Sequence, residues 1–454
     1  MMSRSGRIRR RLLPWRRHPA DREILRLALP ALGALVAEPL FLLADAAIVG
    51  HLGTPQLAGL GIAATILGTL VGVSVFLAYG TTAAVARMLG AADLRGAMRQ
   101  GVDGCWLALV VGSATVLVGW PVTPWLVSLF GPSTDVAGHA EVYLRISLLG
   151  IPAMLLVLAG TGVLRGLQDT RTPLVVAAGG AVGNVVLNLM LVYGLGLGIA
   201  GSALGTVIAQ TTMAAAFARV VVKGARRHGA GLRPDWPGVR RSFGAGMPLV
   251  VRTVAMRVAL VVATVVAAAL GTAELAAYQV AFTTWTLLAL VLDALAIAAQ
   301  ALVGRALGAA DVPAARSTTR RMIQWGILAG TVLAVLVAVS APLYARLFTA
   351  DPQVRTLLTT ALLAVAVMQP VAGWVFVLDG VLIGAGDGRY LAFASALSVA
   401  LFLPTAYAVV LLDLSGPAGL LGLWAAIGVW MLARLGTLTY RERSGAWLVT
   451  GAVR

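Results

Sequence analysis

The sequence predicts an all-α polytopic membrane protein, with twelve transmembrane helices in two parallel-repeat six-helix lobes around a central cavity. Three observations lead to this fold class. The 454-residue chain is 59% hydrophobic and only 12% charged, with a mean hydropathy of +0.90, which is too apolar for a soluble protein of this size. Hydropathy delimits twelve apolar segments, and basic residues are concentrated in alternate loops between them. Finally, the two halves of the chain share motifs at one fixed spacing.

Each apolar segment is long enough to cross a bilayer, which takes about 20 helical residues. Several are longer, so we expect tilted helices or helices that extend beyond the membrane. The predicted spans are residues 24–50, 57–89, 98–120, 138–161, 173–194, 199–222, 243–270, 275–307, 318–341, 355–385, 390–412 and 418–436.

Arginine placement predicts the orientation of these spans. The even-numbered loops are basic, and the longest has seven Lys and Arg residues between Arg219 and Arg241. The odd-numbered loops are nearly free of them, with Arg346 and Arg355 as the exceptions. Cytoplasmic loops are the ones enriched in Lys and Arg, so both termini are predicted to be cytoplasmic, which agrees with an even number of spans. We expect the protein in the cell inner (plasma) membrane.

The formal net charge of +17 does not indicate a nucleic-acid partner, because the arginines lie at span ends rather than in one patch. The single Cys105 cannot form an internal disulfide. The four histidines are not at metal-ligand spacing, and no His-Glu-x-x-His, Cys-x-x-Cys or P-loop motif occurs. We therefore expect no enzymatic activity, no metal site and no cofactor. We also expect the protein to be a monomer in the lipid bilayer.

An internal repeat relates the two halves. Residues 89–93 (LGAAD) recur as residues 307–311, and Pro30 recurs as Pro248, each pair being 218 residues apart. Two such halves of six spans have the same orientation, which is the parallel-repeat arrangement of some transporters. The predicted parts are a basic cytoplasmic arm (1–22), an N-lobe (23–222), a cytoplasmic linker (223–240), a C-lobe (241–436) and a cytoplasmic tail (437–454).

The first span contains two acids, Glu38 and Asp45, which are seven residues apart and so share one helix face. Burial disfavours a charged carboxylate, so both are candidates for reversible protonation or cation contact. Alternatively, Asp45 lies at a helix end in outside water, and Glu38 pairs with an arginine of another helix. Pro30 and Pro39 each remove a backbone donor, and we predict them to be hinge positions.

The fifth span contains two amides, Asn184 and Asn188, one helical turn apart on one face. Buried amides need hydrogen-bond partners, and a carboxyl group of the first span is a natural one. The alternative is a purely structural role in joining helices, which is the main interpretation of Gln210 in the sixth span.

The C-lobe does not repeat the acidic pair, because the equivalent positions are Met256 and Ala263. Its intramembrane charged and polar residues are Arg252, Arg257, Gln279, Asp293, Gln300, Gln369 and Asp379. Charges of both signs inside a membrane pair with one another or face water. We therefore expect a network of Arg252, Asp293 and Asp379, with a structural role and substrate contact both open, and glutamines that line the cavity.

Taken together, these motifs resemble the multidrug and toxic compound extrusion (MATE) family, and its DinF-type branch in particular. The resemblance rests on LPALGALVAEPLFLLADAAIVGHLG in the first span, VLRGLQDTRTP after the fourth, VGNVVLNLMLVYGLG in the fifth, and LVLDALAIAAQALVGRALGAAD and FVLDGVLIGAGD in the second half.

The resemblance implies a two-lobed antiporter that exports amphipathic, often cationic small molecules in exchange for H⁺ or Na⁺. It also implies that Asp45 is the coupling carboxylate, that the first span bends at Pro30 and that polar residues of the fifth span complete the site. The second polar position of that span is often Asp in the family, whereas this chain has Asn188.

The sequence therefore predicts a proton-coupled exporter in which protonation of Asp45 is coupled to bending of the first span. A flippase for lipid-linked oligosaccharides or lipids is an alternative with related architecture. Arg252 and Arg257 favour that alternative, whereas Glu38 and Asp45 argue against an anionic cargo. A membrane scaffold without transport activity is the third possibility, and it would need neither the acidic pair nor two similar lobes.

Overall fold

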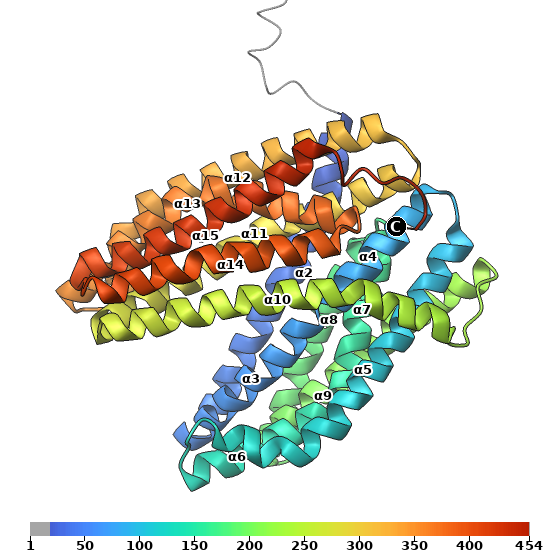
Figure 1. Cartoon of the computed structure of the whole chain (residues 1–454). Helices are drawn as coiled ribbons and strands as arrows, with labels where there is room; N and C mark the ends of the chain where they lie inside the picture. The colour runs from blue at the N-terminus through green and yellow to red at the C-terminus, as the bar shows by residue number, and fades with distance from the viewer. Residues whose placement is uncertain (1–18, 454) are drawn as a thin grey trace, which may run out of the picture.

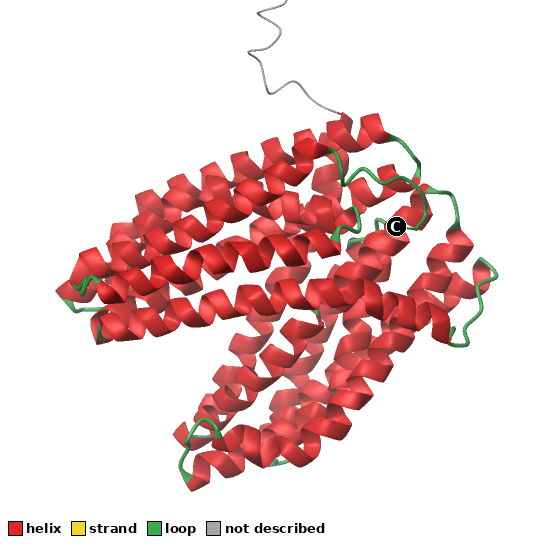
Figure 2. Ribbon diagram, viewed as in Figure 1, coloured by secondary structure: helices red, strands yellow, loops and turns green. Residues whose placement is uncertain are grey.

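The computed structural model describes residues 19–453 (Figure 1). The predicted basic arm, apart from residues 19–22, lies outside the described residues. Within them the chain is helical and contains no strand (Figure 2). The elements are α2 (Pro19–Gly50), α3 (Thr54–Ser74), α4 (Phe76–Gly90), α5 (Leu94–Ser128), α6 (Thr134–Leu148), α7 (Ile151–Gly166), α8 (Arg171–Asn188), the π-helix η2 (Leu189–Gly194), α9 (Gly198–Arg227), α10 (Trp236–Leu270), α11 (Thr272–Gly308), α12 (Val312–Phe348), α13 (Pro352–Gly384), α14 (Gly388–Leu411) and α15 (Gly416–Ser444).

These helices confirm the predicted membrane fold. Eleven helical segments among the described residues are long and apolar enough to cross a membrane, with α3 and α4 forming one of them. A twelfth candidate is the pair of α6 and α7, which are bent by 51° relative to each other and pass the same test when they are counted as one span. Both α9 and α10 extend into the segment 223–240, so the turn between them is shorter than the predicted linker.

Helices α2–α9 form the N-lobe and α10–α15 the C-lobe (Figure 1). The lobes meet where α4 and α2 pack against α11 and where α10 packs against α4 and α5. From that region the two bundles diverge, so that α6 and the far ends of the C-lobe helices lie well apart in Figure 1.

The repeated LGAAD motif brings the backbones of the two lobes close together. A Cβ at Gly90 would overlap the backbone carbonyl oxygen of Arg305, and a Cβ at Gly308 would overlap that of Arg87. Only glycine allows two helix backbones to come this close, so the two copies of the motif fix the crossing of α4 and α11.

The same motif turns the chain into the next helix in both lobes. Ala92 and Ala310 both have φ 58°, a left-handed conformation that is uncommon outside glycine. Asp93 and Asp311 then cap α5 and α12, each accepting a backbone N–H hydrogen bond, at 2.7 and 2.9 Å. The sequence repeat is therefore also a repeat of backbone conformation.

The segment after α15 crosses the region where the lobes meet. Arg87 of α4 donates hydrogen bonds to the carbonyl oxygens of Val449 (2.7 Å), Gly451 (3.1 Å) and Ala385 (3.2 Å). The Gly451 N–H donates to the Leu307 carbonyl oxygen at 3.0 Å. One buried guanidinium thus joins the N-lobe to the C-terminal segment and to the end of α13.

Ion pairs join the start of α2 to the C-lobe in the same region. The Asp21 carboxylate accepts two hydrogen bonds from Arg321, at 2.6 and 2.7 Å, and one from the Trp325 indole at 2.9 Å. Glu23 pairs with Arg305 at 3.1 Å. These contacts hold the lobes together at one end of the molecule.

Candidate functional site

The Asp45 carboxylate lies inside the N-lobe, where α2, α6, α8 and α9 converge, and it is 3% exposed. The Tyr143 hydroxyl of α6 donates to its Oδ2 at 2.9 Å. The Asn188 amide of α8 donates to its Oδ1 at 2.8 Å, and the Ser202 hydroxyl of α9 donates to the same oxygen. One carboxylate therefore joins four helices.

The amides of α8 extend this network away from Asp45. Asn188 Nδ2 also donates to Asn184 Oδ1 at 3.0 Å, and Asn184 Nδ2 donates to Thr206 Oγ1 at 3.1 Å. Both asparagines are buried. Of the two amides that we expected to partner a first-span carboxyl group, Asn188 contacts Asp45 directly, and Asn184 contacts Asn188 in a chain of polar groups that reaches Thr206.

Small residues and a π-helical turn shape this site. A Cβ at Gly205 of α9 would overlap Asn188 Oδ1, so glycine at this position leaves room for the amide in its observed orientation. Directly after Asn188 the chain widens into η2, a geometry that is frequent at functional sites. The Tyr193 hydroxyl of η2 donates to the Ile48 carbonyl oxygen at 2.6 Å and so ties this turn to the end of α2.

The partners of Asp45 are neutral. Among residues 19–453, no ion pair joins Asp45 to a basic side chain. Hydroxyl groups can either donate or accept, and Asn188 Oδ1 is a buried acceptor without a hydrogen-bond partner. The surroundings can therefore serve a carboxylate or a protonated carboxyl group without leaving a cation unpaired.

Glu38 does not join this network. Its side chain is exposed, and within the described part of the chain it has neither an ion pair nor a hydrogen bond, so the predicted alternative of an arginine partner is not observed. The helix α2 continues through both Pro30 and Pro39.

A second cluster of charges lies in the C-lobe around Asp379 of α13. Arg252 of α10 donates to Asp379 Oδ2 at 2.7 Å, and Arg434 of α15 donates to the same oxygen. All three side chains are buried, and removing one partner of such a buried pair typically costs about 3–5 kcal/mol. This arrangement makes the cluster a strong structural link between α10, α13 and α15.

Of the expected network of Arg252, Asp293 and Asp379, the structure contains the close ion pair of Arg252 with Asp379 and adds Arg434 to it. Asp293 interacts with Arg252 and Arg434 only at longer range, and among the described residues it has no ion pair within 4.0 Å. The sequence analysis did not identify Arg434 as a partner of Asp379. Arg434 lies inside the predicted span 418–436, and an arginine within a membrane span indicates by itself that an acidic or polar partner is needed. Tyr143 and Ser202 were also missed, because single hydroxyl groups in apolar spans form no pattern.

The other polar residues singled out in the sequence are dispersed. Gln300 and Gln369 are buried, and the side-chain oxygen of each has no hydrogen-bond partner. Gln279 and Arg257 are exposed, while Gln210 lies against the break between α6 and α7. Among residues 19–453, no group of three or more His, Cys, Asp or Glu side chains could hold a metal ion.

Comparison with known proteins matches the MatE family model to residues 30–190 and 248–408, whose starts are 218 residues apart, as in the internal repeat. The chain is 31% identical over 442 residues to the chloroplastic protein DETOXIFICATION 44 of Arabidopsis thaliana, covering 94% of this chain and 83% of the relative. It is 29% identical over 437 residues to DNA damage-inducible protein F of Escherichia coli (strain K12), covering 94% of each. Its fold is similar to the crystal structure of MATE in the bent conformation, with a TM-score of 0.87, 22% identity and coverage of 95% and 96%.

Proposed function

Because the chain belongs to the MATE family of membrane transporters, we propose that it is a secondary antiporter that exports amphipathic, cationic drugs or metabolites in exchange for H⁺. The observation that supports this proposal best is the buried Asp45 carboxylate with three neutral hydrogen-bond donors. A transporter must bind and release its coupling ion, and a carboxyl group without a permanent cationic partner can do both.

In the proposed cycle, Asp45 takes up a proton from outside. The neutral acid then becomes a hydrogen-bond donor, for which the unpaired Asn188 Oδ1 is a suitable acceptor once the side chains adjust. This change loosens the hold of α6, α8 and α9 on α2, which bends at Pro30 and releases the substrate. Loss of the proton to the cytoplasm restores the network and resets the site.

Alternating access accounts for the second part of the cycle. The lobes meet at the ends of the helices that carry Arg305 and Arg321. In the proposed orientation these ends are cytoplasmic, and we assign this arrangement to the state that is closed to the cytoplasm. In the opposite state the contacts of Asp21 with Arg321 and of Glu23 with Arg305 have to break. One pH unit across the membrane supplies about 1.4 kcal/mol per proton, comparable to the strength of a favourable ion pair.

The flippase alternative is less well supported. An anionic cargo needs unpaired positive charge, but Arg252 and Arg434 are already bound to Asp379. The two arginines, Asp379 and Asp293 together have no formal net charge. Of Arg252 and Arg257, which favoured the flippase in the sequence analysis, only Arg257 is exposed.

Reconstituted proteoliposomes test the proposal. Uptake of a fluorescent organic cation is measured with an imposed pH gradient, then with a Na⁺ gradient, and a lipid-linked sugar is tested in parallel. Uptake driven by the pH gradient supports exchange for H⁺. Uptake driven only by the Na⁺ gradient would show that Na⁺, and not H⁺, is the coupling ion. Movement of the lipid-linked sugar without cation uptake would contradict the exporter.

A further inference from the structure

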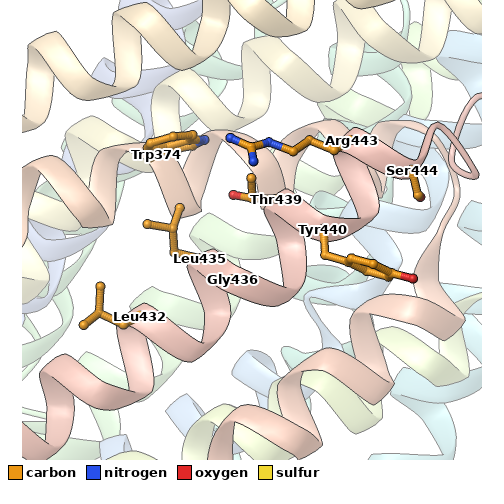
Figure 3. Close-up of a pocket in the computed structure, with 8 residues that line it drawn as sticks. All are labelled: Trp374, Leu432, Leu435, Gly436, Thr439, Tyr440, Arg443 and Ser444. Carbon is orange, nitrogen blue, oxygen red and sulfur yellow. The ribbon is translucent and has the colours of Figure 1, made fainter.

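The C-lobe has a groove on its surface that is remote from Asp45. It has a volume of about 630 Å³ and runs along α15 beside Trp374 of α13 (Figure 3). Leu432 and Tyr440, which line it, are 57% and 71% exposed, so the groove is open to the surroundings of the helix bundle. Its volume is within the range of about 300–1,000 Å³ that is usual for small-molecule sites.

One end of the groove is apolar. Leu432 and Leu435 line it, and a Cβ added at Gly436 would meet no atom within 4 Å, so there is open space beside the helix. The other end is at the last turn of α15, at Arg443 and Ser444. At 1.5 Å per residue, the helix between Leu432 and Ser444 is about 18 Å long, close to the hydrocarbon depth of one leaflet, about 15 Å.

The polar end contains hydrogen-bond donors without acceptors. Trp374 Nε1 and Thr439 Oγ1 are both buried, and neither has a hydrogen-bond partner. Figure 3 shows the Arg443 guanidinium directed along the groove toward the Trp374 indole, with Thr439 beside them. In the described part of the chain Arg443 has no ion pair, whereas Arg441 on the same helix turn is bound to Asp387 at 2.7 Å.

A phosphate group suits the exposed Arg443 guanidinium at this end of the groove. Its oxygens accept several hydrogen bonds at once, and arginine binds phosphate with two parallel N–H donors. A free anion would use only the polar end and leave the apolar part of the groove in contact with other molecules. A phospholipid uses both ends, and the basic ends of membrane helices attract the anionic lipids of the cytoplasmic leaflet.

We propose that this groove binds one phospholipid with an anionic headgroup. Its phosphate lies at the exposed Arg443 guanidinium, and one acyl chain follows α15 over Gly436 to Leu432. The site is separate from the exchange of H⁺ for substrate, and it binds its lipid whether or not the antiport mechanism holds.

Native mass spectrometry of the full-length protein in detergent tests this site. The protein is titrated with phosphatidylglycerol and with phosphatidylcholine of the same acyl chains. We expect Arg443→Ala to weaken phosphatidylglycerol binding about tenfold, as loss of a charge-assisted hydrogen bond does, with little change for phosphatidylcholine. Arg443→Lys keeps the charge and recovers part of the loss. The matched control Arg389→Ala, at another exposed arginine at the basic end of its helix, leaves both affinities unchanged.

Gly436→Leu tests the apolar part of the groove, because a Cβ at this position meets no atom within 4 Å and the longer side chain extends into the space beside the helix. It is expected to weaken the binding of both lipids, while the gel-filtration profile stays that of the wild type. Equal phosphatidylglycerol affinity in the wild type, Arg443→Ala and Gly436→Leu would overturn the proposal. Displacement of the lipid by inorganic phosphate would also overturn it. So would a dimer that forms without lipid and dissociates on Gly436→Leu, because a second copy of the chain would then occupy the groove.

Discussion

Replacing Asp45 by asparagine removes the proposed proton site with almost no change in shape. The remaining oxygen can still accept from Asn188 and Ser202, which share Oδ1, and the new amide can donate to the Tyr143 hydroxyl after that hydroxyl rotates. Hydrogen bonds to a charged group contribute about 1 kcal/mol more than neutral ones, and the lower desolvation cost of a neutral amide offsets part of this loss. We therefore expect a folded variant whose Tm lies within a few degrees of the wild type.

The effect on transport is much larger. A gradient of two pH units supplies about 2.7 kcal/mol per exchanged proton, which sustains about a hundredfold concentration ratio of substrate for one proton per substrate. With Asp45→Asn no proton is exchanged, so the expected ratio falls to one. The measurement is accumulation of a fluorescent organic cation in proteoliposomes with an imposed pH gradient. Exchange without a gradient serves to show that the variant still binds substrate.

Glu38→Gln is the matched control, because it neutralises another acid of the same helix that has no partner among the described residues. We expect it to retain uphill transport. If Asp45→Asn accumulates the substrate as strongly as the wild type, Asp45 is not the coupling group. If only Glu38→Gln loses accumulation, the coupling site is the exposed acid and the network around Asp45 is structural.

Three further predictions concern the framework of the molecule. Asp379→Asn leaves two buried arginines without their anion and should destabilise the protein by about 3–5 kcal/mol, seen as a lower Tm in detergent. Gly308→Ala forces α4 and α11 apart at a cost of about 1–3 kcal/mol or more and should reduce the folded fraction in gel filtration, whereas Gly61→Ala, with no atom near the added Cβ, should not. A double-mutant cycle of Asp21→Ala and Arg321→Ala should give a coupling energy on the order of 1–2 kcal/mol, and additive effects on Tm would contradict the ion pair.

The helical fold could be predicted because it depends on properties that are local in the sequence. The length of an apolar segment decides whether it can span a bilayer, so α5, α11 and the other long helices follow from hydropathy alone. The repeat was equally visible, since the motif that ends at Asp93 and Asp311 recurs letter for letter. The bend between α6 and α7 was not predicted, although Gly150 and Pro152 mark the position of the break in the sequence.

The candidate site was predicted in part. Asp45, Asn184 and Asn188 stood out because carboxyl and amide groups are rare in apolar spans and need partners there. Tyr143 and Ser202, which complete the site, come from spans four and six, and only helix packing places their hydroxyl groups at the carboxylate.

By itself, the sequence determined that this chain is a helical membrane protein of two similar halves with a first-span acid that needs partners. The tertiary structure decided which partners those are. It joined Asp379 to Arg252 and Arg434 rather than to a network that included Asp293. The physical reason is that spacing along a chain fixes the face of a helix on which a residue lies, whereas the rotation and depth of neighbouring helices decide which charges come within hydrogen-bonding distance.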